Sequence, residues 1–190
     1  MQHDVIVVGG SYAGMAASLQ LLRARRSLLV IDAGIRRNRF AKHAYGFLGQ
    51  DGVDPAEIAR MARTQLQAYP TLTWIEDTAE AVTGRKDSRH AGRRVLFANG
   101  VSDALPQIEG LAERWGRSVF HCPYCHGYEL NEGRIGVIAT GPMSVHQAQL
   151  IPEWGAVTFL TNGAVTLEDT VRADLVARKV TIEKTPILRL

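Results

Sequence analysis

The chain has 190 residues, of which 46% are apolar and 22% charged, and its formal charge is +3. This composition is typical of a globular protein with room for one large or two small cores. The basic excess is slight, and its densest stretch, IRRNRF at 35–40, is too short to indicate nucleic-acid binding, although it could meet an anionic phosphate.

No apolar run reaches the roughly 20 residues that a membrane-spanning helix needs. The opening MQHDVIVVGG moves directly into a strand pattern and lacks the features of a signal peptide. We therefore expect no membrane association and a cytoplasmic location. In the reducing cytosol, a closely spaced cysteine pair is usually catalytic or metal-binding.

The first half of the chain predicts alternating strands and helices. Apolar runs predict strands at 4–10, 27–32, 71–76 and 93–100, and helical patterns lie at 15–26 and 52–70. Asp54 suits the N-cap of the second helix because Pro55 follows it at the first helical position. The polar stretch at 83–92 is expected to be a hairpin tip or a loop.

The second half repeats this pattern after 105–116, which is predicted to be a linker. Strands are expected at 134–141, 156–161 and 180–184, and helices at 143–152 and 167–179. Two successive βαβ patterns predict an α/β protein with two Rossmann-like, doubly wound lobes. We place the first domain at 1–105 and the second at 106–190.

The sequence VVGGSYAG at 7–14 lies between the first strand and the first helix, where a dinucleotide-binding turn is expected. Gly9 and Gly14 match the first and last glycines of G-x-G-x-x-G, and Ser11 takes the middle position. The helix N-terminus behind them would attract a pyrophosphate. Asp32, which ends the second strand, could accept hydrogen bonds from ribose hydroxyls and would repel a 2′-phosphate. Together these residues predict nucleotide binding, although the glycines alone would also fit an ordinary α/β turn.

A second glycine turn, VIATGPMS at 137–144, has Ala139, Gly141 and Ser144 at the three glycine positions. The next strand leads into TNGAV, which offers neither an acid for a ribose nor an arginine pair for a 2′-phosphate. The second lobe is therefore expected to keep the Rossmann shape with only weak support for a nicotinamide nucleotide.

Both cysteines lie in HCPYCH at 121–126, a spacing that several chemistries share. Zinc needs about four ligands, and the chain has no second C-x-x-C or H-x-x-x-H pair to supply them. Haem attachment at C-x-x-C-H normally requires an exported chain, and a glutaredoxin-like C-P-Y-C would follow the first strand of a small thioredoxin fold. A purely structural pair of buried thiols stays open.

The other open interpretation is a redox dithiol on a nucleotide-binding protein. A helix that begins at the motif would favour a thiolate, and the C-x-x-C spacing lets the second sulfur resolve a mixed disulfide. His126 follows Cys125 directly and could accept or donate a thiol proton, although a solvated histidine that caps a turn would give the same pattern. Tyr124 and Tyr128 are expected to be packing residues.

Three stretches together resemble the low-molecular-weight thioredoxin reductase family: DVIVVGGSYAGMAASLQLLRARRSLLVIDAG, RNRFAKHAYGFLGQDG and HCPYCHGYE. The nearest resemblance is to the branch of thioredoxin-reductase-like flavoproteins and dithiol oxidases with a C-P-x-C-H motif. It implies a homodimer in which an FAD-binding lobe is interrupted by a pyridine-nucleotide-type lobe that carries the C-x-x-C. In such proteins FAD passes electrons from NADPH to the disulfide, which then reduces a thioredoxin-like protein or a small-molecule disulfide. In the oxidase branch, electrons run from a substrate dithiol through FAD to oxygen.

The resemblance also implies site residues. The residues expected to contact FAD are Gly9, Ser11, Gly14, Asp32, Asn38, Gln50 and Ala79. The first four would hold the adenosine and pyrophosphate, the next two the flavin or its linker, and the last the adenine through its backbone. Cys122, Cys125 and His126 would be catalytic, with Cys125 facing the flavin and Cys122 exchanging with substrate.

Three departures from the family pattern bear on function. The chain ends at Leu190, whereas family members continue through a Gly-Asp motif that grips FAD. Asn99 stands where the family usually has Thr, the hairpin region before it is abbreviated, and the arginine-rich NADPH signature is absent. The sequence therefore predicts an FAD-dependent disulfide oxidoreductase. The alternative is a truncated, non-catalytic paralogue that binds a nucleotide or a partner subunit.

Overall fold

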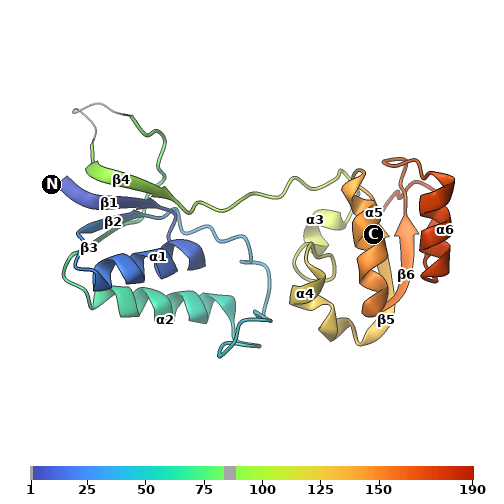
Figure 1. Ribbon diagram of the computed structural model, residues 1–190, viewed down its shortest axis with the longest axis horizontal. Helices are drawn as coiled ribbons and strands as arrows, with labels where there is room; N and C mark the ends of the chain where they lie inside the picture. Colours follow the sequence, from blue (N-terminus) through green and yellow to red (C-terminus); the bar gives the residue numbers. More distant parts are fainter. Residues whose placement is uncertain (1, 84–88) are drawn as a thin grey trace. The chain divides into compact units, whose positions relative to one another are not determined.

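The computed structural model describes residues 2–83 and 89–190. The chain divides into two compact units, of which unit 1 comprises Met1–His43 and Gly52–Asp103, and unit 2 comprises Ala44–Asp51 and Ala104–Leu190. Each unit contains a parallel sheet with helices packed on it, so the predicted α/β class is confirmed (Figure 1). The assignment of the two predicted domains to FAD and to a pyridine nucleotide stays a prediction.

Unit 1 is built on a four-stranded parallel sheet in the order β3-β2-β1-β4. Its elements are β1 (Gln2–Val8), α1 (Tyr12–Arg23), β2 (Leu28–Ile31), α2 (Pro55–Gln67), β3 (Leu72–Ile75) and β4 (Ala91–Phe97). The two helices lie side by side against one face of the sheet (Figure 1). They share with it a buried apolar cluster of Met15, Leu22, Leu28, Ala59 and Leu66. Burial of one Leu or Met side chain contributes about 1.5–3 kcal/mol, so this cluster holds the two layers together.

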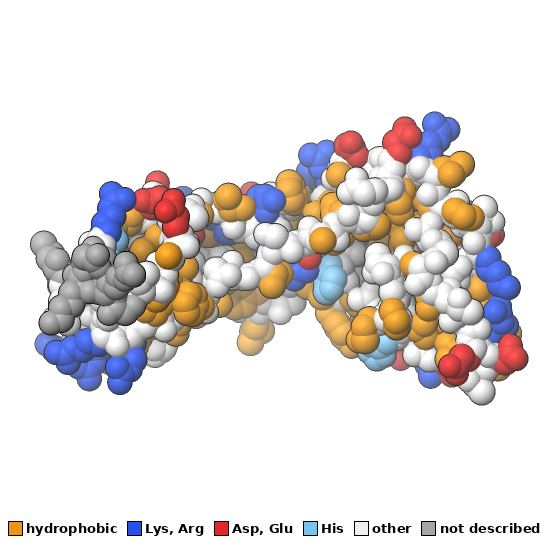
Figure 2. All heavy atoms as spheres, turned by 90° about the horizontal axis from the view of Figure 1, so that it is seen from above, with side chains coloured by type: hydrophobic (Ala, Val, Ile, Leu, Met, Phe, Trp, Pro, Cys, Tyr) orange, Lys and Arg blue, Asp and Glu red, His pale blue; other side chains and the backbone are white. Residues whose placement is uncertain are grey.

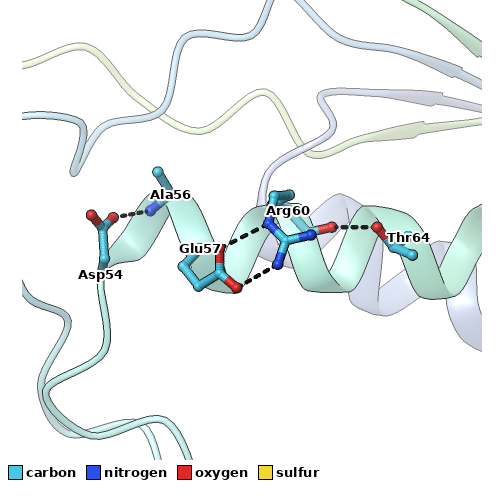
Figure 3. A network of polar contacts seen from close by, with 5 residues as sticks. All are labelled: Asp54, Ala56, Glu57, Arg60 and Thr64. Atoms are coloured by element: carbon cyan, nitrogen blue, oxygen red, sulfur yellow. Dashed lines mark hydrogen bonds and ion pairs between the residues drawn. The ribbon is translucent and has the colours of Figure 1, made fainter.

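The start of α2 follows the predicted capping pattern. Asp54 accepts a hydrogen bond from the backbone N–H of Ala56 at 2.6 Å, and Pro55 occupies the first turn, where no intrahelical N–H bond is needed (Figure 3). Within the same first turn, Glu57 accepts two hydrogen bonds from Arg60, one of them from Nε at 2.8 Å. The cap fixes the residue at which α2 begins.

The opposite face of the unit 1 sheet borders a cavity of about 560 Å³. Its apolar lining comes from the strands and includes Ile6, Val8, Ile31, Ile75 and Val95, and the segment 77–83 lines it from the side. Residues 84–88 of the predicted hairpin tip or loop lie outside the described residues. Because β3 and β4 form opposite edges of the sheet, the hairpin interpretation is wrong.

Unit 2 contains a three-stranded parallel sheet in the order β5-β6-β7. Its strands are β5 (Glu132–Ile138), β6 (Gly155–Leu160) and β7 (Thr181–Glu183). Its helices are α3 (Leu111–Arg114), α4 (Pro123–His126), α5 (Met143–Leu150) and α6 (Asp169–Ala177), with 3-10 turns η1 (Tyr128–Leu130) and η2 (Ile151–Glu153). Phe159 on β6 and Leu175 on α6 are fully buried in one apolar cluster, which joins the strands to the helices.

The segment 105–116, predicted to be a linker, forms part of unit 2. It contains α3, whose Leu111 is only 2% exposed. The carbonyl oxygen of Glu109 accepts a hydrogen bond from the Leu190 N–H at 2.9 Å, and the backbone of Glu109 forms an isolated parallel β-bridge with that of Arg189. The linker prediction missed this structure because the pairing of Glu109 with Arg189 and Leu190 joins residues that are distant in the sequence.

Candidate functional site

The glycine turn of unit 1 joins β1 to α1. Gly9 has a φ of +103°, and a Cβ at this position would lie 2.4 Å from the carbonyl oxygen of Ala98. A Cβ on Gly14 would lie 1.9 Å from the carbonyl oxygen of Gly9. Both positions therefore require glycine, the first for the turn and the second for the close approach of α1 to the end of β1.

Asp32 follows β2, and its carboxylate reaches back to the turn. Its Oδ1 accepts a hydrogen bond from the Gly10 N–H at 3.1 Å, and the indole of Trp74 packs against the same glycine. Ser11 is the N-cap of α1, and its carbonyl oxygen accepts the first helical hydrogen bond, from Met15. A carboxylate thus lies beside the start of a 12-residue helix, which suits a ribose and a pyrophosphate.

Tyr12, which the sequence patterns did not indicate, ties three segments together. Its hydroxyl donates to the carbonyl oxygen of Pro55 at 2.8 Å and accepts from Asn38 Nδ2 at 3.3 Å. Asn38 is therefore held next to the first residue of α1. The only signal in the sequence was an aromatic residue within the glycine turn.

The two other predicted cofactor residues have different surroundings. Ala79 lines the cavity on the sheet of unit 1. Gln50 lies in Ala44–Asp51, the segment that packs with unit 2, and its N–H donates to the carbonyl oxygen of Phe47 at 2.8 Å. Unit 1 therefore holds Gly9, Ser11, Gly14, Asp32, Asn38 and Ala79, whereas Gln50 belongs to unit 2.

The two cysteines lie at α4 of unit 2. Cys122 is its N-cap and Cys125 its third residue. Their Sγ atoms are 2.9 Å apart, well beyond the roughly 2.05 Å of a disulfide, so the two cysteines are reduced, and the Cys125 thiol donates a hydrogen bond to Cys122 Sγ. Both side chains are partly exposed, which suits exchange with a substrate better than a buried structural pair. Because α4 has only four residues, its dipole contributes little to the stability of a thiolate.

His126 ends α4 and stacks on the ring of Phe120. The ring centroids are 4.1 Å apart and the planes are inclined by 24°. Burial lowers the pKa of His126, and the negative charge of Glu129 acts in the opposite direction. The imidazole is therefore neutral near pH 7, in the form that can accept a proton from a thiol.

Exposed aromatic residues lie within and after the C-x-x-C motif. The prediction that Tyr124 and Tyr128 are packing residues is wrong for Tyr128, which is 86% exposed. Tyr124 packs edge-on against Trp154, with ring centroids 5.1 Å apart, and is 70% exposed. On the face of unit 2 seen in Figure 2, hydrophobic side chains lie next to histidine side chains.

The second glycine turn is occupied by hydrogen bonds within the chain. Ser144 Oγ accepts from the Thr140 N–H at 3.0 Å. After β6, the side-chain oxygen of Asn162 accepts from the Ile187 N–H at 2.9 Å. A Rossmann lobe recognises a ribose from this position after its second strand, so these contacts add no support for a nicotinamide nucleotide here.

The described part of the chain bears on two other possibilities, a metal site and a membrane-spanning helix. Among residues 2–83 and 89–190, no group of three or more His, Cys, Asp or Glu side chains could hold a metal ion. The zinc interpretation of HCPYCH therefore has no complete ligand set in that part of the chain. Within the same residues, no helix has both the length and the apolar character needed to span a membrane.

Comparison with known families and structures decides what kind of protein combines the glycine turn of unit 1 with the cysteine pair of unit 2. The family model described as pyridine nucleotide-disulphide oxidoreductase matches residues 3–186. The chain belongs to this family. The family implies the use of a flavin, and the glycine turn with Asp32 has the features of a dinucleotide-binding site.

Relatives of this family member are thioredoxin reductases. Thioredoxin reductase tcpT of Claviceps purpurea (strain 20.1) is 34% identical over 152 residues, which cover 74% of this chain and 47% of the relative. Thioredoxin reductase aclD of Aspergillus oryzae (strain ATCC 42149 / RIB 40) is 32% identical over 191 residues, covering 90% and 60%. The chain thus spans about half the length of the curated relatives it matches.

Two solved structures are similar to almost the whole of this chain. The oxidoreductase from Agrobacterium tumefaciens is 51% identical, with a TM-score of 0.94, and the match covers 100% of this chain and 67% of that one. HlmI is 35% identical, with a TM-score of 0.90, covering 98% and 63%. The predicted resemblance to thioredoxin reductases is therefore confirmed.

Proposed function

We propose that this family member exchanges two electrons between FAD and a disulfide or dithiol substrate through Cys122 and Cys125. The observation that carries the proposal is the pair of partly exposed, reduced cysteines, with their Sγ atoms 2.9 Å apart, in a chain that also has a dinucleotide turn. Oxidation of this pair to a disulfide would transfer two electrons to FAD, with release of two protons, and would need only a small movement of the sulfur atoms.

The residues of unit 1 fit the adenosine and pyrophosphate of FAD. Asp32 would accept hydrogen bonds from the ribose, and the start of α1, with Ser11 and Gly14, would face the pyrophosphate. Asn38, Gln50 and Ala79 are proposed as further contacts by resemblance. When bound, the flavin supplies a two-electron donor or acceptor for the dithiol, with Cys125 as the sulfur that faces it.

Disulfide reduction can be written with the residues of this chain. Cys122, as a thiolate, attacks the substrate disulfide and forms a mixed disulfide, and one substrate sulfur leaves. Cys125 then attacks Sγ of Cys122, which releases the second substrate sulfur and leaves a Cys122–Cys125 disulfide. Two electrons move to the substrate, and the two thiol protons end on its two sulfurs. The neutral imidazole of His126 would carry a proton from thiol to leaving group, and the reverse sequence oxidises a dithiol.

The proposal extends to partners by analogy with the named relatives. The substrate would be a thioredoxin-like protein or a small-molecule disulfide or dithiol, and the partly exposed cysteines are accessible to either. NADPH is a weakly supported donor, since the second glycine turn lacks residues for its ribose and 2′-phosphate. A homodimer and a cytoplasmic location complete the proposal.

A second candidate is a non-catalytic paralogue that binds a nucleotide or a partner subunit. The observation that favours it is the second glycine turn, where Ser144 and Asn162 form hydrogen bonds within the chain and no acid or arginine pair is available for a nicotinamide nucleotide. The visible absorption spectrum of the purified protein, recorded before and after addition of FAD, separates the two candidates. A bound flavin band supports the oxidoreductase, and protein that stays colourless supports the second candidate.

The catalytic role of the cysteines is tested by substitution. Cys122→Ser should abolish turnover of a model disulfide and leave bound flavin in place, because Cys122 has no proposed contact with FAD. Ser118→Ala, at an exposed position four residues earlier, is the matched control and should behave as wild type. Unchanged turnover in Cys122→Ser would refute the assignment.

A further inference from the structure

The stacked rings of Phe120 and His126 lie at the two ends of the dithiol loop, residues 121–125. Phe120 lies two residues before Cys122, and His126 follows Cys125 directly, so the two rings join the ends of the segment that carries both sulfurs. The centroid distance of 4.1 Å is shorter than the roughly 4.5–7 Å typical of aromatic pairs. Both side chains are half-buried, so the contact is neither a core contact nor a freely solvated one.

We propose that Phe120 is a positioning residue for disulfide exchange, because its ring fixes the orientation of the imidazole of His126, the residue after Cys125, and shields it from water. The proposal rests on the proposed function, in which His126 carries a thiol proton. Without a flat partner, a histidine at the end of a four-residue helix would sample several rotamers. A ring stacked at 24° to the imidazole permits only the rotamers of His126 in which the two planes lie nearly face to face.

Phe120 has two opposing effects on the charge of His126. Its shielding disfavours the imidazolium, whereas the face of its ring would attract a cation. Burial is the largest influence on the pKa of His126 and lowers it, so we expect the loss of shielding to dominate when the ring is removed. Glu129, on η1, is the charged group that acts on His126 among the described residues, and it raises this pKa. The titratable groups of the adjoining segments, 121–125 and 127–130, are His121, Cys122, Tyr124, Cys125, Tyr128 and Glu129.

The first test is an NMR titration of the histidine rings in the full chain. The signal of His126 is assigned as the one that disappears in His126→Asn. Phe120→Leu keeps an apolar side chain but removes the flat ring, and it should raise the pKa of His126. Phe120→Tyr keeps the ring and is the matched control, with no shift expected. Glu129→Gln should shift the pKa in the opposite direction, downward.

The second test is the rate of exchange between the dithiol and a small aromatic disulfide, measured against pH. In Phe120→Leu the midpoint of this profile should move in the same direction as the pKa of His126, and the rate at neutral pH should fall roughly tenfold, a part of what general acid–base catalysis supplies. Phe120→Tyr should have the same midpoint and the same rate at neutral pH as the wild type. Phe120→Met, a second variant without a ring, is measured in parallel in case the leucine variant does not fold.

Several results would overturn the inference. If the ringless variants leave the pKa of His126 unchanged, the ring does not shield the imidazole, and if they lower it, the ring acts mainly as a cation partner. Equal exchange profiles for Phe120→Leu and Phe120→Tyr would show that Phe120 has a packing role only. If His126→Asn exchanges at the wild-type rate at every pH, the proton role in the proposed function also fails. A shifted titration with an unshifted exchange profile removes only the role of Phe120.

Discussion

Replacing Gly14 by alanine should destabilise unit 1, although alanine is the better helix former. Within α1, alanine would gain about 1 kcal/mol over glycine from helix propensity. The added Cβ would lie 1.9 Å from the carbonyl oxygen of Gly9, whose own N–H is held by Ile31 at 2.8 Å. Since this backbone cannot move aside as a flexible side chain would, the overpacking should cost about 2–3 kcal/mol, the upper part of the usual range of about 1–3 kcal/mol. We expect a net loss of about 1–2 kcal/mol in the free energy of unfolding.

The assay is thermal unfolding of the full chain followed by circular dichroism. For a unit of this size, each 1 kcal/mol corresponds to about 4–8 °C, so Tm should fall by about 4–16 °C. Gly141→Ala is the matched control, because a Cβ there meets nothing within 4 Å and φ lies outside the left-handed region. It should leave stability unchanged or raise it by about 0.4–1 kcal/mol. A Tm for Gly14→Ala equal to or above that of wild type would refute the close approach of α1 to β1.

Three other predictions concern binding, capping and pH. Asp32→Asn should weaken FAD binding roughly 10–100-fold, because a hydrogen bond to a charged acceptor contributes about 1.5–3 kcal/mol, and an unchanged Kd in calorimetric titration would rule out the ribose contact. Asp54→Ala removes the 2.6 Å cap on Ala56 and should lower the free energy of unfolding in urea by about 0.5–2 kcal/mol, whereas Ser118→Ala should not change it. Hydrogen bonds from Ser27 hold the pKa of Asp4 below its ordinary 3.8. The carboxylate therefore stabilises the fold above that pH, and the stabilisation is lost as pH falls through the lowered pKa. Stability should consequently fall less in Asp4→Asn than in wild type on acidification, and parallel acid curves would show that Asp4 plays no such part.

Local patterns predicted the elements where one apolar face determines the structure. The strands before and after the glycine turn were expected at 4–10 and 27–32 and lie at Gln2–Val8 and Leu28–Ile31. The first helix begins at Tyr12, three residues earlier than expected, because Ser11 acts as its N-cap within the turn. The Asp54 cap of α2 was predicted because both the capping side chain and the following proline are adjacent in the sequence.

Contacts between distant segments could not be predicted in this way. The bond from Tyr12 to Pro55 spans 43 residues, and no sequence period links them. The stack of Phe120 on His126 depends on how the dithiol loop folds back, and neither ring belongs to a regular apolar pattern. Gln50 was assigned to the cofactor by resemblance alone, and its packing with unit 2 is a property of the tertiary structure.

Electron transfer between FAD and a dithiol through Cys122 and Cys125 is tested by the anaerobic reaction of the purified flavin-loaded protein with a small dithiol. We expect the visible flavin band to bleach in the wild type as electrons pass through the cysteine pair, and to persist in Cys122→Ser and Cys125→Ser. A protein that binds no flavin after FAD is added, or a band that bleaches equally fast in both serine variants, would contradict it.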